Sequence, residues 1–217
     1  MLTCGIDEAG RGPVIGPMVI TGVLFDESAL PRLQALGVKD SKQLSARRRE
    51  QLFHEIKKIA KEIVSITVSA AEIDAAVLSQ TTNLNWLEAD TTVAIIEKLM
   101  PEKAYIDCPS TNILAYRDYL SRKLTSTAKL VVEHKADETY LEASAASIIS
   151  KVLRDQEIEK IKRKIGFDFG SGYPADERTR KFLEQNWQKY PEIFRKSWEP
   201  YKRMVTGKQS SLNTAWG

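Results

Sequence analysis

The sequence contains only two cysteines and two histidines among its 217 residues. Cys4 and Cys108 lack zinc-type spacing, and each lies in or beside an apolar, strand-like run. We therefore expect buried free thiols and no disulfide framework. His54 lies inside an ordinary surface helix, and His134, three residues before Asp137, either has no role or assists proton transfer. Neither histidine is a strong candidate for a catalytic base.

Other signatures are absent as well. No apolar run approaches the roughly 18 residues of a membrane span, and the chain enters a strand pattern at once, without the basic segment of a leader peptide. We expect a cytoplasmic, monomeric protein with no membrane contact. The sequence has no Walker-type phosphate loop and no Gly-x-Ser-x-Gly elbow, which disfavours P-loop and serine-hydrolase chemistry.

The composition is that of a globular protein with an uneven charge distribution. The chain is long enough for one sizeable domain, and 42% hydrophobic residues can build its core. Residues 1–150 carry 17 basic and 20 acidic side chains, whereas residues 151–217 carry 15 and 9. This C-terminal basic excess fits a polyanionic partner, but it also fits ordinary solvated helices.

The apolar pattern predicts strands followed by helices. Strands are expected over 1–6, 18–25, 62–69, 103–107 and from 130 onward. Helices are expected over 45–61, 70–78, 83–99, 113–125, 140–164 and 176–188, and a brief helix or turn over 30–36. The first two strands should pair antiparallel, and the later alternation predicts parallel crossovers. The expected fold is α/β, with strand 62–69 buried on much of both faces.

Acidic residues follow three of the predicted strands. Asp7 and Glu8 follow the first, Asp107 ends the fourth, and Asp137 follows the fifth, where it could also be a simple helix N-cap. Neighbouring side chains on extended backbone point to opposite faces, so only one of Asp7 and Glu8 can face a given site directly. The four acids should converge at one end of the sheet.

Such an oxygen-only cluster would repel itself unless cations were bound. Mg²⁺ is the natural occupant, because it is a hard ion that prefers carboxylates, water and phosphate oxygens. Two such ions about 4 Å apart could activate a water and stabilise the departing oxygen of an in-line displacement at phosphorus. This chemistry describes a nuclease.

Three further segments could contact a ligand. The loop Gly10-Arg11-Gly12 has little bulk and allows close approach of a ligand, although it could be an ordinary charged turn. Tyr173, between glycine and proline, could be exposed or packed under a turn. Hydroxyls and cations spaced by three, four and three residues form a stripe that suits either solvent or a phosphate backbone: Ser144, Ser147, Lys151 and Arg154.

The most specific motifs are Gly5-Ile6-Asp7-Glu8-Ala9-Gly10-Arg11-Gly12, Lys39-Asp40-Ser41-Lys42, Tyr105-Ile106-Asp107, Lys135-Ala136-Asp137, Ser144-Ala145-Ala146-Ser147-Ile148, Lys151-Val152-Leu153-Arg154-Asp155 and Gly170-Ser171-Gly172-Tyr173-Pro174. Together they resemble the type 2 ribonucleases H (RNase HII), in the single-chain archaeal form, over nearly the whole chain. One departure is Tyr140-Leu141-Glu142-Ala143, where the family often has Tyr-Pro-Val-Val.

The resemblance implies an RNase H-like fold, a mixed five-stranded sheet flanked by helices, with a C-terminal helical extension. It implies a catalytic domain over 1–165, an extension over 166–208 that completes the substrate groove, and a flexible tail over 209–217. The implied activity is endonucleolytic cleavage of RNA in RNA/DNA hybrids, and cleavage 5′ of ribonucleotides embedded in duplex DNA. It would leave 5′-phosphate and 3′-hydroxyl ends and serve removal of misincorporated ribonucleotides and RNA primers in replication and repair.

The resemblance also implies residue roles. Asp7, Glu8, Asp107 and Asp137 would be catalytic ligands of two Mg²⁺ or Mn²⁺ ions. The backbone of Gly10, Arg11 and Gly12 would read the 2′-hydroxyl, and Tyr173 would stack on the sugar after the ribonucleotide. The remaining substrate contacts, chiefly to phosphates, would come from Lys39, Ser41, Lys42, Ser144, Ser147, Lys151 and Arg154.

The C-terminus resembles a box that binds a DNA sliding clamp of the proliferating cell nuclear antigen (PCNA) type. Gln209, Leu212 and Trp216 would be its contacts, while Ala215 stands where a first aromatic is usual. The alternative is a polar tail without a partner.

Two other function classes share part of the pattern. A recombination nuclease or transposase-like integrase would use the same acids without a reader of the 2′-hydroxyl. A non-catalytic hybrid-binding module would lack one acid.

Overall fold

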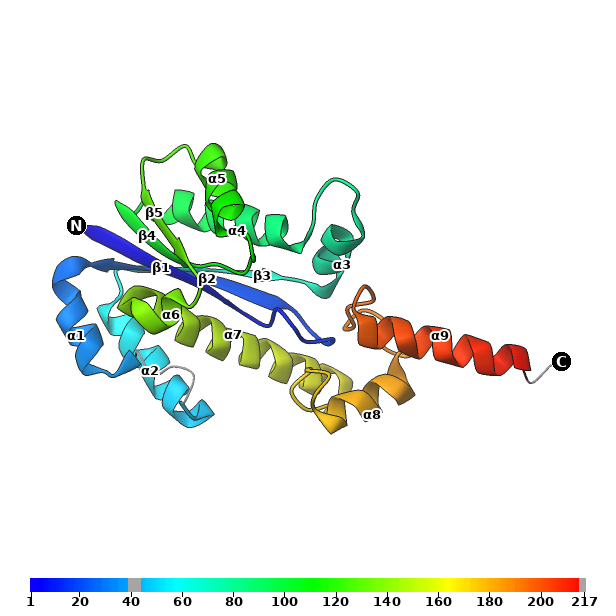
Figure 1. Cartoon of the computed structure of the whole chain (residues 1–217). Helices are drawn as coiled ribbons and strands as arrows, with labels where there is room; N and C mark the ends of the chain where they lie inside the picture. Colours follow the sequence, from blue (N-terminus) through cyan, green and yellow to red (C-terminus); the bar gives the residue numbers. More distant parts are fainter. Residues whose placement is uncertain (39–43, 215–217) are drawn as a thin grey trace.

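The computed structural model describes residues 1–38 and 44–214, with side chains as far as Thr206. Its centre is a five-stranded sheet in the order β3-β2-β1-β4-β5 (Figure 1). The strands are β1 (Leu2–Ala9), β2 (Met18–Asp26), β3 (Glu62–Val68), β4 (Lys103–Asp107) and β5 (Lys129–Glu133). The pairs β1–β2 and β2–β3 are antiparallel, whereas β1–β4 and β4–β5 are parallel. The predicted α/β sheet with an antiparallel front section is confirmed.

The helices begin where polar capping residues precede the apolar periodicity. They are α1 (Leu30–Ala35), α2 (Ala46–Ile59), α3 (Ala70–Leu78), α4 (Leu84–Leu99), α5 (Ile113–Lys123), α6 (Ala136–Thr139), α7 (Leu141–Ile165), α8 (Glu177–Asn186) and α9 (Glu199–Thr214), with a 3-10 turn η1 (Glu27–Ala29). The Ser45 and Asn83 side chains accept backbone N–H bonds at the starts of α2 and α4. Ser69 and Glu72 form a capping box at α3.

Helices cover both faces of the sheet (Figure 1). On one face α7 lies against β1 and β2, and its Ile148 and Val152 share a buried cluster with Val23 of β2. On the other face α4 and α5 pack over the sheet, with Ile95 and Tyr116 fully buried. The central strand β1 is therefore held from both sides, which fixes the position of the acids that it carries.

The C-terminal segments pack against the loop that joins β1 to β2. Val14 and Ile15 of that loop share a third buried cluster with Phe182 of α8 and with Phe194 and Tyr201. Phe194 and Tyr201 are therefore packing residues of this cluster. The extension thus contacts the chain directly after the first acidic pair.

Several boundaries differ from the sequence-based expectation. β1 runs through Ala9, because its pairing with β2 continues to Val19, so Asp7 and Glu8 lie inside the strand. The expected burial of β3 on both faces is wrong: β3 is an edge strand with alternating exposure, since α7 packs chiefly on β1 and β2.

The C-terminal boundaries also differ. The fifth strand ends at Glu133, and the long helix starts only at Leu141, after the separate α6. α9 was not expected; its backbone continues to Thr214 through a run without proline.

The remaining global expectations concern thiols and membranes. Both cysteines are buried and free, as predicted. None of the helices in the described part of the chain is long and apolar enough to cross a membrane.

Candidate active site

Asp7 and Glu8 lie on the central strand β1. Asp7 is 5% exposed, and its Oδ1 accepts a 2.8 Å hydrogen bond from the Glu8 N–H. Because consecutive strand residues face opposite sides, α7 covers the face of Asp7 while Glu8 turns toward α4. The negative charge of Asp107 contributes to raising the pKa of both Asp7 and Glu8. Both side chains therefore lie near Asp107, at the end of β4.

Asp107 and Asp137 come to β1 by different routes. Parallel pairing sets Ile106 opposite Ile6, so Asp107 follows beside Asp7. Asp137, which is 2% exposed, lies in α6 and not at the end of β5. The left-handed Lys135 (φ 59°) turns the chain after β5, and the Ala136 N–H donates to Asp107 Oδ1 at 3.0 Å. The turn brings the last two acids together.

Burial and like charge dominate the electrostatics of the acids. Burial is the main cause that raises the pKa of Asp7 to about 7, and the Asp107 carboxylate is the next. A Ser147 hydrogen bond and the Lys151 charge act in the opposite direction. The pKa of Glu8 is raised well above its usual range, first by burial and then by Asp7. Without a bound cation, this environment disfavours the ionised form of Asp7 and Glu8.

The donor set fits hard divalent cations. All four predicted ligands offer carboxylate oxygens, which Mg²⁺ and Mn²⁺ prefer, and a cation between them would relieve the repulsion that raises these pKa values. Over residues 1–38 and 44–214, no three acidic, histidine or cysteine side chains are already grouped as a formed ion site. Carboxylate side chains can change rotamer when an ion binds, so the four acids still supply a suitable donor set.

The loop after β1 is compact and anchored by its own arginine. Gly10 has φ +87°, and a methyl group there would lie 2.8 Å from the Pro17 carbonyl oxygen. The Arg11 side chain donates to Glu88 Oε1 at 2.8 Å and to Asn85 Oδ1 at 2.7 Å, both on α4. This loop therefore has a fixed conformation next to Glu8.

Sequence analysis did not identify Glu88 and Asn85. Glu88 is 2% exposed, and burial raises its pKa to about 7 against the opposing charge of Arg11. The sequence does contain one signal for Glu88: an acidic residue on the buried face of a predicted helix needs a cationic partner. The sequence does not show which cation that is.

The hydroxyl-and-cation stripe on α7 lies inside the protein. Ser144 and Ser147 are fully buried and Arg154 is 4% exposed, which excludes a solvated face for these three residues. Lys151 Nζ donates to Ser147 Oγ at 2.6 Å, next to Asp7. The Ser144 hydroxyl donates to the Asp137 carbonyl. Three of the four stripe residues thus surround predicted metal ligands.

Arg154 and Tyr173 form a second group beside the loop. The Arg154 guanidinium lies 5.1 Å from the centre of the Tyr173 ring and donates to the Ser171 carbonyl at 2.8 Å. Tyr173 is 39% exposed, so it is not packed under the turn. A methyl group on Gly12 would lie 3.7 Å from the Tyr173 ring. The tyrosine therefore borders the glycine loop.

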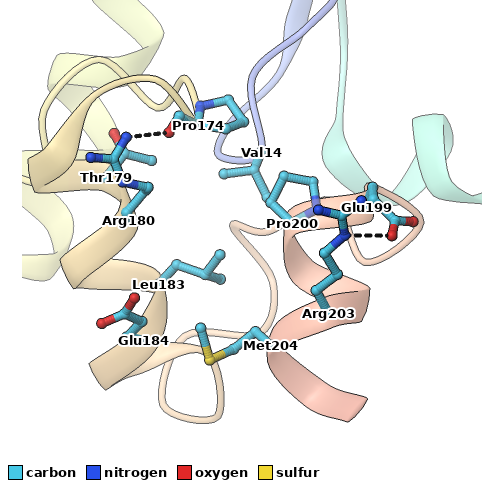
Figure 2. A pocket seen from close by; sticks show the side chains of 10 residues that line it. All are labelled: Val14, Pro174, Thr179, Arg180, Leu183, Glu184, Glu199, Pro200, Arg203 and Met204. Atoms are coloured by element: carbon cyan, nitrogen blue, oxygen red, sulfur yellow. Dashed lines mark hydrogen bonds and ion pairs between the residues drawn. The ribbon is translucent and has the colours of Figure 1, made fainter. Parts of the chain in front are cut away.

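A groove in the C-terminal part of the chain does not contain the acids. A cavity of about 590 Å³ lies between α8 and α9 beside Pro174 (Figure 2). Val14, Leu183 and Met204 contribute apolar lining. Two arginines that also line it are engaged in hydrogen bonds, Arg180 with the Pro174 carbonyl and Arg203 with Glu199. None of the four acids lines it, so it is separate from the candidate active site.

Some predicted residues fall where the structure gives no description. Lys39, Ser41 and Lys42 lie outside the described residues, as does Trp216. Gln209 and Leu212 lie on the backbone of α9, beyond the last described side chain. Their roles stay predictions. For His134 the structure records a 3.1 Å contact between Nδ1 and the Cys108 carbonyl oxygen.

Comparisons with known proteins agree with this fold. The family described as Ribonuclease HII matches residues 4–201. A curated Ribonuclease HII of Thermococcus onnurineus is 43% identical over 209 residues, 94% of this chain and 90% of the relative. The crystal structure of ribonuclease H2 from Pyrococcus horikoshii has a TM-score of 0.87 and 42% identity, and it covers 95% of this chain and 98% of that one.

A second solved structure is that of a PCNA:RNase HII complex from Archaeoglobus fulgidus. It has a TM-score of 0.82 and 42% identity, with 92% of this chain and 96% of that one covered. The five-stranded mixed sheet, the match over residues 4–201 and these identities over almost complete chains show that the protein belongs to the ribonuclease HII family, the type 2 ribonucleases H.

Proposed function

We propose that this protein hydrolyses RNA in RNA/DNA hybrids and cuts on the 5′ side of ribonucleotides embedded in duplex DNA. The cut would leave 5′-phosphate and 3′-hydroxyl ends, by two-metal-ion catalysis with Mg²⁺ or Mn²⁺. The cellular role would be removal of misincorporated ribonucleotides and RNA primers during replication and repair. Residues 166–208 would complete the substrate groove of the 1–165 catalytic domain.

One observation carries the proposal. Buried Asp7, whose carboxylate interacts electrostatically with Asp107 and Asp137, lies three residues before a rigid glycine turn that is bordered by an exposed tyrosine. A metal-dependent nuclease needs the acids, but only an enzyme that recognises a 2′-hydroxyl needs backbone groups that approach the sugar closely. The combination favours a ribonuclease H over an integrase-like nuclease.

The chain's residues divide the work. Asp7, Glu8, Asp107 and Asp137 would hold the ions, which when bound would activate water and stabilise the leaving oxygen. Lys151, through Ser147, orients Asp7 and partly offsets its charge. The Arg154 guanidinium packs against the Tyr173 ring and would hold it in place. Lys39, Ser41, Lys42 and the half-buried Lys151 would contact phosphates. The other stripe residues on α7, Ser144, Ser147 and Arg154, are buried and would position neighbouring groups instead.

A cleavage assay with three duplexes tests the function. We expect cutting of a long RNA/DNA hybrid and of a DNA duplex with one ribonucleotide, and none of an all-DNA duplex. EDTA should abolish both activities, and Mg²⁺ or Mn²⁺ should restore them. Comparable cutting of all-DNA would favour the integrase-like alternative, whereas binding without cleavage would favour a hybrid-binding module.

Tyr173→Ala should reduce cleavage at a single embedded ribonucleotide more than cleavage of a long hybrid. We expect loss of the ring contact with the sugar to cost about 1.4 kcal/mol, which corresponds to about 10-fold slower cleavage of the single-ribonucleotide duplex. A long hybrid offers many ribonucleotides at which the enzyme can bind and cut, so its cleavage rate should fall less. Tyr173→Phe keeps the ring and is the matched control, with near-normal rates. An equal loss on both substrates would leave Tyr173 with a structural role only.

We also propose that the C-terminus binds a DNA sliding clamp through Gln209, Leu212 and Trp216. The solved PCNA:RNase HII complex of the Archaeoglobus fulgidus relative supports this partner. Leu212 and Trp216 are four residues apart, so one helical turn brings them together, as in helix-in-groove recognition. Tethering would raise the enzyme's effective concentration on replicated DNA.

Deleting residues 209–217 should leave cleavage of short duplexes intact and remove binding to the clamp of the same organism. The double variant Leu212→Ala/Trp216→Ala in the full-length chain should lose clamp binding to the same extent. This result would assign the loss to these two side chains. Titration calorimetry measures the affinity. If full-length protein shows no binding at clamp concentrations up to roughly 100 μM, weaker than most specific peptide contacts, the clamp proposal is wrong.

A further inference from the structure

Arg195 is a fully buried arginine that lies outside the carboxylate cluster. It occupies the segment between α8 and α9 and is among the largest side chains of the described residues with no exposed surface. Such a charged group is rarely buried without a full set of partners. Burial lowers its pKa to about 10, which leaves the guanidinium charged near neutral pH.

In the described structure, the hydrogen-bond acceptors of the Arg195 guanidinium are all backbone carbonyls of one loop. Nε donates to the Gly16 oxygen at 3.0 Å, and the two terminal nitrogens donate to the Arg11 oxygen at 2.8 Å and the Gly10 oxygen at 2.5 Å. The group lies 5.0 Å from the centre of the Trp198 ring, whose Nε1 donates to the Gly12 oxygen at 3.2 Å. Arg195 and Trp198 thus bind successive carbonyls of the glycine loop.

The segment that carries Arg195 is itself fixed. The Arg195 N–H donates to the Val14 carbonyl, and the Gly16 N–H donates to the Ile193 carbonyl, both at 2.9 Å. Asp74 of α3 accepts bonds at 2.8 Å from the N–H groups of Lys196 and Ser197. The guanidinium is therefore a rigid support.

These bonds determine where the loop's N–H groups point. The C=O and N–H of a trans peptide point in opposite directions, and the described residues contain no cis peptide. With the Gly10 and Arg11 carbonyls turned toward Arg195, the N–H groups of Arg11 and Gly12 point away from it. Glu88 and Asn85 hold the Arg11 side chain separately, so the loop is restrained by both its backbone and its side chain.

We propose that Arg195, supported by Trp198, is a positioning residue that orients the peptide groups of the Gly10–Gly12 loop and thereby determines recognition of a single ribonucleotide. The inference rests on the proposed reading of the 2′-hydroxyl by this loop. Arg195 has no contact with substrate in this account. Its effect passes through the direction of the loop carbonyls.

The test compares Arg195→Ala and Arg195→Lys with Phe182→Leu, a matched core variant of the same extension that touches none of these carbonyls. For each variant, kcat/KM is measured on a duplex with one ribonucleotide and on a long RNA/DNA hybrid, together with Tm. Both Arg195 variants should lose about tenfold more on the single ribonucleotide than on the hybrid. Phe182→Leu should lower Tm with equal losses on both substrates.

Two further measurements separate positioning from folding. Millimolar methylguanidinium should partly restore single-ribonucleotide cleavage by Arg195→Ala and do nothing for Phe182→Leu. If Arg195→Ala does not fold, Trp198→Phe keeps an aromatic ring beside Arg195, removes the bond to Gly12 with some loss of packing, and should show a smaller loss in the same direction.

The possible outcomes distinguish the two proposals. Equal losses on both substrates, in proportion to the fall in Tm and without methylguanidinium rescue, would overturn the role of Arg195. If wild-type protein fails to cut the single-ribonucleotide duplex at all, the proposed function itself fails.

Discussion

Replacing Asp7 by asparagine is expected to abolish cleavage and, at the same time, to stabilise the metal-free protein. The amide keeps the shape of the side chain but removes a charge that would be needed to hold an ion, so activity should fall on the order of 10³-fold or more. The same charge is unfavourable without metal, because it is buried beside Asp107. The stability gain at pH 8 in EDTA should be on the order of 2 kcal/mol.

The pH dependence gives the sign of this effect. Since the pKa of folded Asp7 is raised to about 7 from its ordinary 3.8, the folded state binds more protons than the unfolded state between these values. The stability of metal-free protein should therefore fall as pH rises from about 4 through about 7. Asp7→Asn should flatten this slope, and Mg²⁺ should do so in the wild type.

Denaturant unfolding in EDTA and a cleavage assay on the same purified samples measure both effects. Asp118→Asn is the matched control, because Asp118 is exposed on α5; it should change neither activity nor the pH slope. Near-normal turnover by Asp7→Asn, or a loss of its metal-free stability, would contradict the assignment of Asp7 to a metal-binding carboxylate cluster.

Gly5→Ala should be the most destabilising single methyl addition near the site. A methyl group on Gly5 would lie 1.9 Å from the carbonyl carbon of Glu142 and 2.2 Å from the nitrogen of Ala143. These are backbone atoms of α7, so no side-chain rotation can relieve the overlap. The helix would have to move away from β1, at a cost of about 3 kcal/mol or more.

Activity should fall with stability in this variant, because α7 carries Ser147 and Lys151 to Asp7. Unfolding free energy and kcat/KM are measured together. The control is Gly166→Ala at the end of α7, where a methyl group meets nothing within 4 Å and only the left-handed backbone (φ +70°) is strained. A smaller loss in Gly5→Ala than in this control would show that α7 is not closely packed on β1.

Local pattern was sufficient to predict the sheet and the acids. Apolar runs that end in acids located Asp7, Glu8 and Asp107, and strand–helix alternation gave the parallel half of the sheet. Asp137 was identified, but its place on α6 depends on the left-handed turn at Lys135, which sequence pattern does not reveal.

Long-range polar partners could not be predicted. Arg11 forms a hydrogen bond with Glu88, 77 residues away in the sequence, and Arg195 forms one with the Gly10 carbonyl, 185 residues away. Each pair forms only when separate helices or extensions pack around β1. Periodicity gives the face on which a residue lies; it does not identify the charged residue that lies opposite. The buried positions of Ser147 and Arg154 depend in the same way on the packing of α7 against β1.

Mapping the product ends from a DNA duplex that contains one ribonucleotide is the most direct test of the proposed cleavage. We expect a single, Mg²⁺-dependent cut on the 5′ side of the ribonucleotide, with a 3′-hydroxyl that a DNA polymerase extends and a 5′-phosphate on the downstream fragment. A cut on the 3′ side with a 2′,3′-cyclic phosphate, undiminished by EDTA, would show that the 2′-hydroxyl itself attacks phosphorus and would contradict this proposal.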